Sequence, residues 1–346
     1  MNHILRNKTK GKILFVEGRH IYKAINGILL HSSNNGNSWE EIQKVQGDAF
    51  LEKFIYFSHL ACRLFRKGIH HFNIQSENKY AILFDKNIKI VNNGNLVKQV
   101  PIKGSRPLSF EFINQEFVYG EYRSNLERSD IGIFGFNVNG ELHNRATMAG
   151  IRHIHGVYQD AYTGLVWITT GDENNEAAIY CTDIEFKSIE KILYGSQQIR
   201  TIKLLFDENY IYFGSDAPNE TNYLYRMEKN LYKVEKLTKV GSSVFHGCKL
   251  KNWFFFSTAI EPSMVNKTKY AELWASPNGT EWSRIMKFKK DFFSMRYFQY
   301  GQIFFPNGKG NDEDLWISLL ATKYTNQSFR VSLDEVEALF FKNRSL

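Results

Sequence analysis

The feature that most constrains the fold of this chain is an internal repeat of about 48 residues. Short apolar segments open at Arg106, Arg152 and Arg200, which are 46 and 48 residues apart, and a fourth opens near His246, 46 residues further on. Each is followed by further short apolar stretches, such as Val166-Trp-Ile-Thr-Thr-Gly. Several short strands that recur every 40–50 residues or so are the pattern of a β-propeller, in which each blade stacks on its neighbours to bury both faces.

The number of blades follows from the stretches before and after these four repeats. Ile13 to Val45 and Ile69 to Val100 have the same strand content, and a last set begins at Arg296 and includes Gln302 to Phe305. We therefore predict a single all-β domain over residues 1–346, a propeller of four-stranded antiparallel blades with seven blades. The alternative is six blades, in which Ile13 to Val45 closes the ring together with the C-terminal strands.

Two stretches predict helices outside the blades. Residues 49–66 carry apolar side chains at helical spacing, so we expect a helical insertion that packs on the propeller through this stripe. A short C-terminal helix is expected near 332–342, because Ser332 and Glu335 have the spacing of a capping box. The stripe consists of Phe50, Phe54, Phe57, Ala61 and Leu64.

Composition narrows the classes of partner and location. The net charge of +8 is spread along the chain, which suits a polyanionic partner. No nucleic-acid-binding motif is present, so we expect no nucleic-acid partner. Because no apolar run approaches 18 residues and Ile13 to Val16 is too short for a signal segment, we expect a cytoplasmic protein without membrane contact. The cysteines, Cys62, Cys181 and Cys248, match neither a zinc spacing nor a disulfide framework.

Two similar turns join third and fourth strands of their repeats, Ser32-Ser-Asn-Asn-Gly-Asn-Ser-Trp39 and Ser276-Pro-Asn-Gly-Thr-Glu-Trp282. Asn favours turns, Gly36 and Gly279 supply positive φ, and the Trp is expected to pack the hairpin on its blade. Both turns resemble the Asp-box (BNR repeat) of sialidase-like β-propellers, with Asn where Asp usually stands. Cys181-Thr-Asp183 resembles a third, degenerate copy.

This resemblance covers the architecture of most of the chain and carries no site residue by itself. It implies a propeller whose boxes lie on the face away from the active site, and a carbohydrate-active protein. In sialidases three arginines hold the substrate carboxylate and a Tyr is the nucleophile, which implies Arg152, Arg200 and Arg296 for the triad and Tyr297 for the nucleophile.

Polar residues recur at the loops that enter each first strand and that join second to third strands. In a propeller these loops open on one face, so we predict a ligand site at the central mouth. For any one of these residues the alternative is structural, such as an Arg that pairs with a carboxylate of the next blade. The predicted substrate-binding residues are Arg106, Arg152, His153, Glu173, Gln197, Gln198, Arg200, Glu220, Glu261 and Arg296, and the predicted catalytic residues are Asp172, Asp216, His155, His246 and Tyr297.

The chemistry of this set favours an acidic poly- or oligosaccharide, because guanidinium groups pair with carboxylates. A glycoside hydrolase would use Asp172 and Asp216 as paired carboxylates, whereas a polysaccharide lyase would use a His or Tyr base with Arg neutralising a uronate. The alternative is a non-catalytic propeller that binds a glycan or a protein partner. We expect no cofactor and no metal, although His153, His155, His246 and Asp172 are residue types that bind metals.

Overall fold

The computed structural model describes residues 7–45, 50–76, 78–137 and 139–344. Ala49, the first residue of the expected helical insertion, lies outside this part. The described strands form seven sheets, each with four antiparallel strands, to one of which a fifth is added. The prediction of an all-β propeller with seven blades is therefore confirmed over the six-bladed alternative. By its contacts the chain divides into two compact units, unit 1 (1–69 and 240–346) and unit 2 (70–239).

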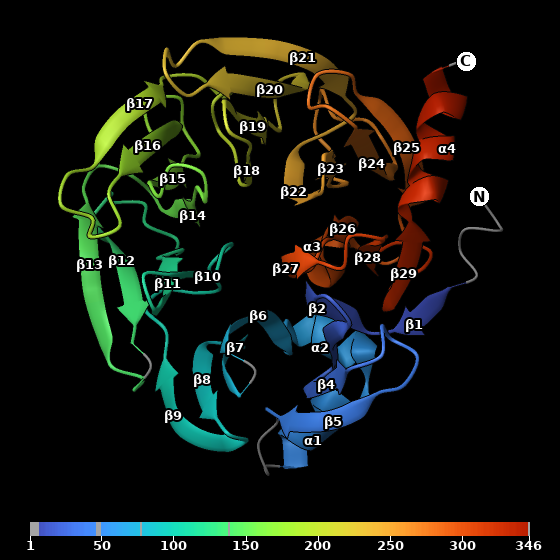
Figure 1. The fold of residues 1–346 in the computed structure, drawn as a ribbon. Coiled ribbons are helices and arrows are strands. Elements are labelled where there is room, and N and C mark those ends of the chain that lie inside the picture. Colours follow the sequence, from blue (N-terminus) through green and yellow to red (C-terminus); the bar gives the residue numbers. More distant parts are fainter. Residues whose placement is uncertain (1–6, 46–49, 77, 138, 345–346) are drawn as a thin grey trace. The chain divides into compact units, whose positions relative to one another are not determined.

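Unit 2 consists of four consecutive blades, in which each strand pairs with the next along the chain (Figure 1). The second strands are buried along most of their length because neighbouring sheets cover them on both faces, and in β15 all five residues are buried. The blades are β6 (Ile69–Ser76), β7 (Lys79–Phe84), β8 (Asn87–Asn92), β9 (Asn95–Pro101); β10 (Glu111–Ile113), β11 (Glu116–Gly120), β12 (Ile131–Phe136), β13 (Leu142–Met148); β14 (Ile154–Gln159), β15 (Val166–Thr170), β16 (Ala178–Thr182), β17 (Glu190–Tyr194); and β18 (Leu204–Phe206), β19 (Tyr210–Gly214), β20 (Asn222–Glu228), β21 (Val234–Val240).

Unit 1 contains three blades, two of which combine strands from both ends of the chain. The first strand, β1, pairs antiparallel with β29, and β27 joins β2 as a parallel fifth strand. The sheets are β2 (Lys12–Glu17), β3 (His20–Ile25), β4 (Ile28–Ser32), β5 (Glu40–Lys44) with β27 (Asn307–Gly310); β22 (Val244–Leu250), β23 (Trp253–Thr258), β24 (Tyr270–Ser276), β25 (Ser283–Lys289); and β1 (Lys8–Lys10), β29 (Gln327–Ser332), β28 (Asp314–Leu320), β26 (Gln302–Phe304).

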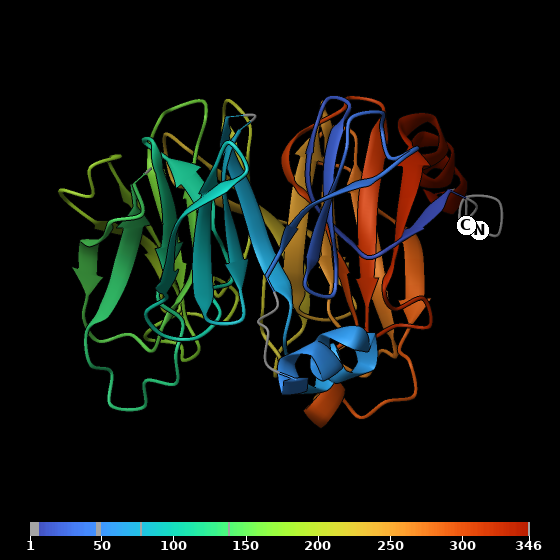
Figure 2. The same ribbon diagram turned by 90° about the horizontal axis from the view of Figure 1, so that it is seen from below.

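Two helices, α1 (Phe50–Phe57) and α2 (His59–Phe65), occupy the stretch between the first two blades along the chain. The expected stripe is not the buried face: Phe50 is 87% exposed and Phe57 is 89% exposed, while Ile55 and Tyr56 are buried. The reason is the break at Ser58, which caps α2 and changes the phase of the helix, so one continuous stripe cannot form. Figure 2 shows these helices together with α3 (Met295–Phe298) at one end of the unit 1 strands.

The buried anchor of this helical layer is a cation. Arg63, 3% exposed, pairs with Asp291 at 2.7 Å and donates to the carbonyl of Phe298 at 2.6 Å. The stripe pattern treated Arg63 as lying off the packed face, but its long side chain reaches a partner 228 residues away in sequence. The ion pair therefore ties α2 to the segment that carries α3.

The C-terminal helix, α4 (Leu333–Arg344), begins with a formed capping box. The amide of Glu335 donates to Ser332 Oγ at 3.2 Å, and the amide of Ser332 donates to the Glu335 carboxylate at 3.0 Å. Val336 and Phe340 are fully buried, and α4 packs on β25. In the described ranges, no helix has the length and apolar character needed to cross a bilayer.

The two similar turns have the same hydrogen bonds. The indole N–H of Trp39 donates to the carbonyl of Gly36 at 3.1 Å, and that of Trp282 donates to the carbonyl of Gly279 at 3.0 Å. Both glycines have positive φ, 82° and 71°. The Asn side chains, Asn34 and Asn278, accept backbone N–H groups inside their turns. The shared sequence pattern thus produces one turn geometry in two blades of unit 1.

Candidate functional site

Loops of unit 2 gather charged side chains around Asp172, which follows β15. Arg152, in the loop before β14, places Nη1 2.9 Å from Asp172 Oδ2. Arg200, in the loop before β18, places Nη2 3.2 Å from Asp172 Oδ1, and its Nε donates to Asp216 Oδ2 at 3.1 Å. We call Arg152, His153, His155, Asp172, Arg200 and Asp216 the Asp172 cluster.

Two histidines, His153 and His155, complete the cluster. His153 lies just before β14 and is 4% exposed, and His155 lies in β14 and is 2% exposed. Their Nε2 atoms are 3.5 and 3.7 Å from Asp172 Oδ1. The strand register shifts between Ile154 and Gly156, which makes His155 the extra residue of a bulge. Bulges redirect side chains, so the meeting of the two rings depends on this local geometry.

The electrostatics of the cluster hold Asp172 as an anion. Burial alone would raise the pKa of its carboxyl, but the neighbouring histidines and the charge of Arg200 outweigh burial and hold the pKa well below its usual range. Burial lowers the pKa of His155, which favours its neutral form. Asp172 is therefore a permanent counterion at neutral pH and is not a proton donor there.

Two neighbours of the cluster were not predicted from the sequence. The Tyr122 ring packs on the His153 ring with centroids 4.1 Å apart, and burial together with Asp172 and Asp216 raises the pKa of Tyr122. Glu176, 2% exposed, accepts from the backbone amide of Arg152 at 3.1 Å and from Arg128 Nε at 2.5 Å. Both residues lie in loops that join a second strand to a third strand, as Asp172 does. Their position in these loops is the sequence signal that could have found them.

The remaining predicted residues of unit 2 surround the cluster with polar contacts. Gln197 Nε2 donates to the backbone carbonyl of Asp172 at 2.8 Å. Gln198 donates to Glu220 at 2.5 Å and accepts from the Tyr225 hydroxyl at 2.7 Å. The structure thus brings Gln197 to the cluster and pairs Gln198 with Glu220. Glu173 is exposed beside Asp172, and Arg106 is half-buried between β9 and β10.

Four predicted residues belong to unit 1. His246 Nε2 lies 2.9 Å from Gln302 Oε1, and the His246 ring packs on Phe304. Glu261 accepts a hydrogen bond from the Ser243 hydroxyl at 2.6 Å. Arg296 and Tyr297 lie in α3, where the guanidinium is 5.5 Å from the tyrosine ring and Tyr297 is 54% exposed. Within unit 1 these residues form separate local contacts: His246 binds at β26, while Arg296 and Tyr297 contact each other.

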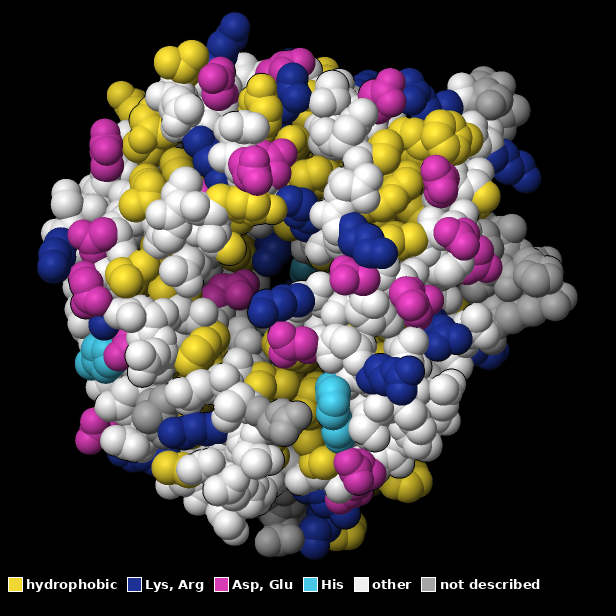
Figure 3. Space-filling view, viewed as in Figure 1, with side chains coloured by type: hydrophobic (Ala, Val, Ile, Leu, Met, Phe, Trp, Pro, Cys, Tyr) yellow, Lys and Arg dark blue, Asp and Glu magenta, His cyan; other side chains and the backbone are white. Residues whose placement is uncertain are grey.

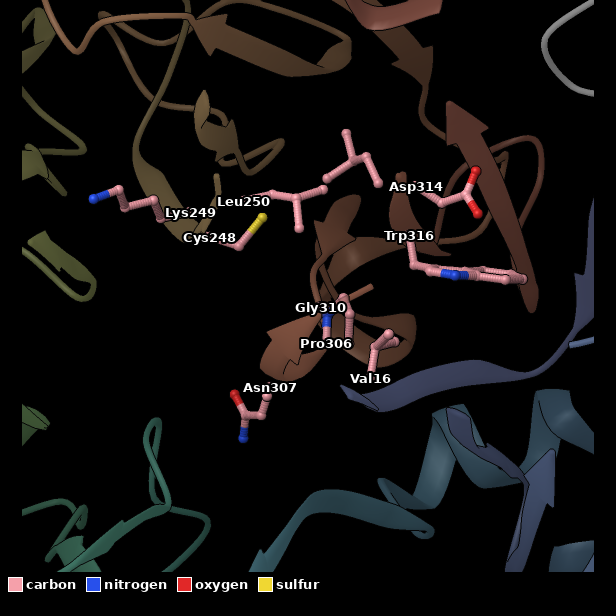
Figure 4. A pocket seen from close by; sticks show the side chains of 11 residues that line it. Val16, Cys248, Lys249, Leu250, Pro306, Asn307, Gly310, Asp314 and Trp316 are labelled. Carbon is pink, nitrogen blue, oxygen red and sulfur yellow. The ribbon is translucent and has the colours of Figure 1, made fainter. Parts of the chain in front are cut away.

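Unit 1 also contains a small pocket with mainly apolar walls. Figure 4 shows Leu250 and Cys248 of β22 and Trp316 of β28 around this space, together with Asn307 and Asp314. Among the described residues, the charged groups that line it are the carboxylate of Asp314 and the amine of Lys249, and they do not form a cluster of titratable groups. The pocket suits a small apolar group and lacks the charged groups of the Asp172 cluster.

The surface charge is mixed. On the face shown in Figure 3, Lys and Arg side chains are interspersed with Asp and Glu side chains in small groups. The net charge of +8 is thus not gathered there into one basic patch. A surface of this kind favours recognition by a few placed residues over non-specific attraction of polyanions.

Comparisons with known proteins return the fold and no family. No family model matches the chain, and no curated protein matches it. Among solved structures, "Oligogalacturonate lyase in complex with manganese" has a TM-score of 0.60 at 8% identity, covering 94% of this chain and 90% of that one. "Crystal Structure of Mitotic Checkpoint Complex" also gives 0.60 at 8% identity, with 94% and 95% covered. "YCF48 bound to D1 peptide" gives 0.56 at 13% identity, with 94% of both chains covered. At these identities the likeness shows that the chain has a β-propeller fold, and the role of the fold differs between the three.

Proposed function

We propose that this protein is a carbohydrate-active β-propeller that binds an acidic oligosaccharide at the Asp172 cluster, with Arg152 as the residue that pairs with a ligand carboxylate. The observation that carries this proposal is the state of the Arg152 side chain. It is held by Asp172 through Nη1 and is still 29% exposed. A guanidinium that one carboxylate fixes in place and that remains partly exposed can bind a ligand carboxylate in a defined orientation.

Binding is favoured over hydrolysis by the role of the two carboxylates. Asp172 and Asp216 both pair with Arg200, so each serves as a counterion. Hydrolysis by paired carboxylates needs one that keeps a proton near neutral pH, and the low pKa of Asp172 opposes this role. The cluster is therefore better suited to holding a charged ligand than to protonating a glycosidic oxygen.

Elimination is the second candidate, because of Tyr122. Elimination needs a base that takes the proton next to the uronate carboxylate, which the neutral ring of His155 can supply. It also needs an acid for the leaving oxygen, which the protonated phenol of Tyr122 can supply beside Arg152. One of the structures with this fold is an oligogalacturonate lyase. The Asp-box-like turns at Trp39 and Trp282 add support for a carbohydrate role, since they resemble those of sialidase-like propellers.

Isothermal titration with matched neutral and uronate-containing oligosaccharides tests this proposal. We expect the wild type to bind the acidic ligands in preference, and Arg152→Met to weaken that binding by about 30- to 100-fold, the usual effect of removing one partner of a buried charge pair. Arg145→Met is the matched control, because Arg145 pairs with Glu116 and Glu185 in the same unit. Equal binding of neutral and acidic ligands by the wild type would refute an acidic ligand.

The same titration separates binding from elimination. An increase in the ultraviolet absorbance of an unsaturated uronate would show elimination, and its loss in Tyr122→Phe would assign the proton donor. Unchanged sugars recovered after prolonged incubation would leave binding as the activity. An acidic peptide, run in parallel, distinguishes a glycan from a protein partner, because one of the structures with this fold is bound to a peptide.

A further inference from the structure

The tautomers of His153 and His155 are fixed by backbone carbonyls. His153 Nδ1 lies 3.2 Å from the carbonyl oxygen of Arg123, and His155 Nδ1 lies 3.2 Å from the carbonyl oxygen of Thr201. A carbonyl oxygen only accepts, so each Nδ1 carries a hydrogen. In a neutral imidazole the lone pair is then on Nε2, and both Nε2 atoms face Asp172.

These three groups make an unusual set of acceptors. One ring nitrogen of His153, one of His155 and a carboxylate oxygen of Asp172 all lie within 4.8 Å of one another. His153 is 4% exposed, and its Nε2 has no hydrogen-bond partner among the residues that the structure describes. When both rings are neutral, their Nε2 lone pairs face the Asp172 carboxylate with no hydrogen to donate to it, and a cation at their centre would offset this repulsion.

The spacing of the acceptors suits a single metal ion. Ligand atoms that lie about 2.1 Å from a tetrahedral ion are about 3.4 Å from each other. The Nε2 atoms of His153 and His155 lie 3.5 and 3.7 Å from Asp172 Oδ1, close to this value. Only small movements of the two rings would bring all three atoms to bonding distance.

The hydrogen bonds around the two histidines and Asp172 are those typical of metal ligands. Metal-binding histidines usually donate their other N–H to a carbonyl or carboxylate, and ligating carboxylates are themselves hydrogen-bonded. Both histidines donate in this way, and Arg152 fixes the second oxygen of Asp172. The positive charge of Arg200 is offset by Asp216, so it does not by itself exclude a cation at Oδ1.

We propose that His153, His155 and Asp172 form a binding site for a divalent transition-metal ion, with the two Nε2 atoms and Oδ1 as ligands. Two imidazoles and one carboxylate suit Zn²⁺, Mn²⁺, Fe²⁺ and Co²⁺, and three protein ligands leave at least one position open. This goes beyond oligosaccharide binding and differs from our expectation of no metal. The open position would accept an oxygen of a ligand held at Arg152.

Metal titration without any sugar tests the site, so its outcome is independent of the proposed oligosaccharide binding. Chelator-treated, folded protein is titrated with Zn²⁺, Mn²⁺ and Co²⁺ by calorimetry, and Co²⁺ binding is also followed by its visible absorption. We expect one ion per chain, a higher melting temperature in its presence, and affinity at least about 100-fold lower in His153→Gln and His155→Gln. His143→Gln is the matched control, because His143 pairs with Glu116 elsewhere in unit 2 and should leave metal affinity unchanged.

A second measurement does not depend on whether the variants fold. Nitrogen NMR of the wild-type histidines distinguishes a neutral imidazole with a free Nε2, which metal addition should shift, from a doubly protonated ring. Protonated rings at neutral pH that do not respond to metal would overturn the proposal, because imidazolium would then satisfy the carboxylate. Absence of saturable binding of all three ions to the folded wild type would overturn it equally.

Discussion

Arg152 and Asp172 form an ion pair of 2.9 Å between Nη1 and Oδ2, which joins the two loops at the open end of the β14–β15 hairpin. Their charges neutralise each other where both side chains are partly exposed, at 29% and 17%. The pair therefore has a structural role and at the same time orients a guanidinium toward any ligand of the cluster.

Asp172→Asn should lower the free energy of unfolding by about 2–3 kcal/mol, because it leaves Arg152 and Arg200 without the charge that both contact. Denaturant unfolding at pH 7 measures this difference. Glu185→Gln is the control, since Glu185 is 46% exposed and pairs with Arg145 at 3.3 Å, and it should change stability by less than about 0.5 kcal/mol. An equal effect of both substitutions would contradict the structural role of Asp172.

The pH dependence of stability should also depend on Asp172. Its pKa in the folded protein is far below the ordinary value of 3.8, so the unfolded chain takes up the proton first as the pH falls. The stabilisation is therefore fully present above about pH 5 and decreases as the pH falls below about 4. Between pH 5 and pH 3 the wild type should lose more free energy of unfolding than Asp172→Asn, and parallel curves for the two proteins would be evidence against a lowered pKa.

His59 should produce a separate pH effect at higher pH. Burial, followed by the charges of Arg63 and Lys10, lowers the pKa of His59 from 6.5 to about 4, so the folded protein excludes a proton that the unfolded chain accepts. Stability is therefore expected to decrease as the pH falls from 6.5 toward 4, by about 1–2 kcal/mol at pH 5. His59→Asn should flatten this part of the curve, whereas His143→Gln, at an exposed surface pair, should not.

Trp39→Ala and Trp282→Ala should each lower stability by about 2–3 kcal/mol, the effect of removing a large, partly buried aromatic side chain. Trp39 also loses the contact of its ring with the Lys23 amine, and Trp282 loses its contact with Phe256. Thermal and denaturant unfolding measure the change. Ligand binding by the folded fraction should not change, because both turns belong to unit 1 and the Asp172 cluster belongs to unit 2.

The α1 helix offers a test of which face is buried. Phe57→Ser should change the free energy of unfolding by less than about 0.5 kcal/mol, because the ring is 89% exposed. Tyr56→Ala should cost about 3 kcal/mol, because the Tyr56 ring is buried against Gly27. The reverse order of the two effects would favour the sequence-based stripe.

Much of the fold was readable from local patterns. The recurrence near Arg106, Arg152 and Arg200 identified the blades because each blade is one unit of four short strands, and strand chemistry is local. The capping box at Ser332 and the Asn-Gly turns before Trp39 and Trp282 were readable for the same reason, since their hydrogen bonds join residues a few positions apart.

Part of the site was also readable, because propeller topology places equivalent loops together. Arg152, Asp172, Arg200 and Asp216 come from such loops, and the structure brings them within ion-pair distance. Their proposed roles rest on chemistry that this topology does not decide. Which arginine remains partly exposed depends on the exact placement of each carboxylate.

The sequence by itself therefore determined the repeat, the blade and the turn, all of which depend on contacts within about 50 residues. Only the tertiary structure decided the buried face of α1, the pairing of Arg63 with Asp291, and the bulge that turns His155 toward Asp172. These features depend on the competition of distant groups for one buried charge or one layer of the core. Burial makes such competition strong, because an unpaired charge or an acceptor without a hydrogen bond in the interior costs several kcal/mol, about as much as a whole protein's margin of stability.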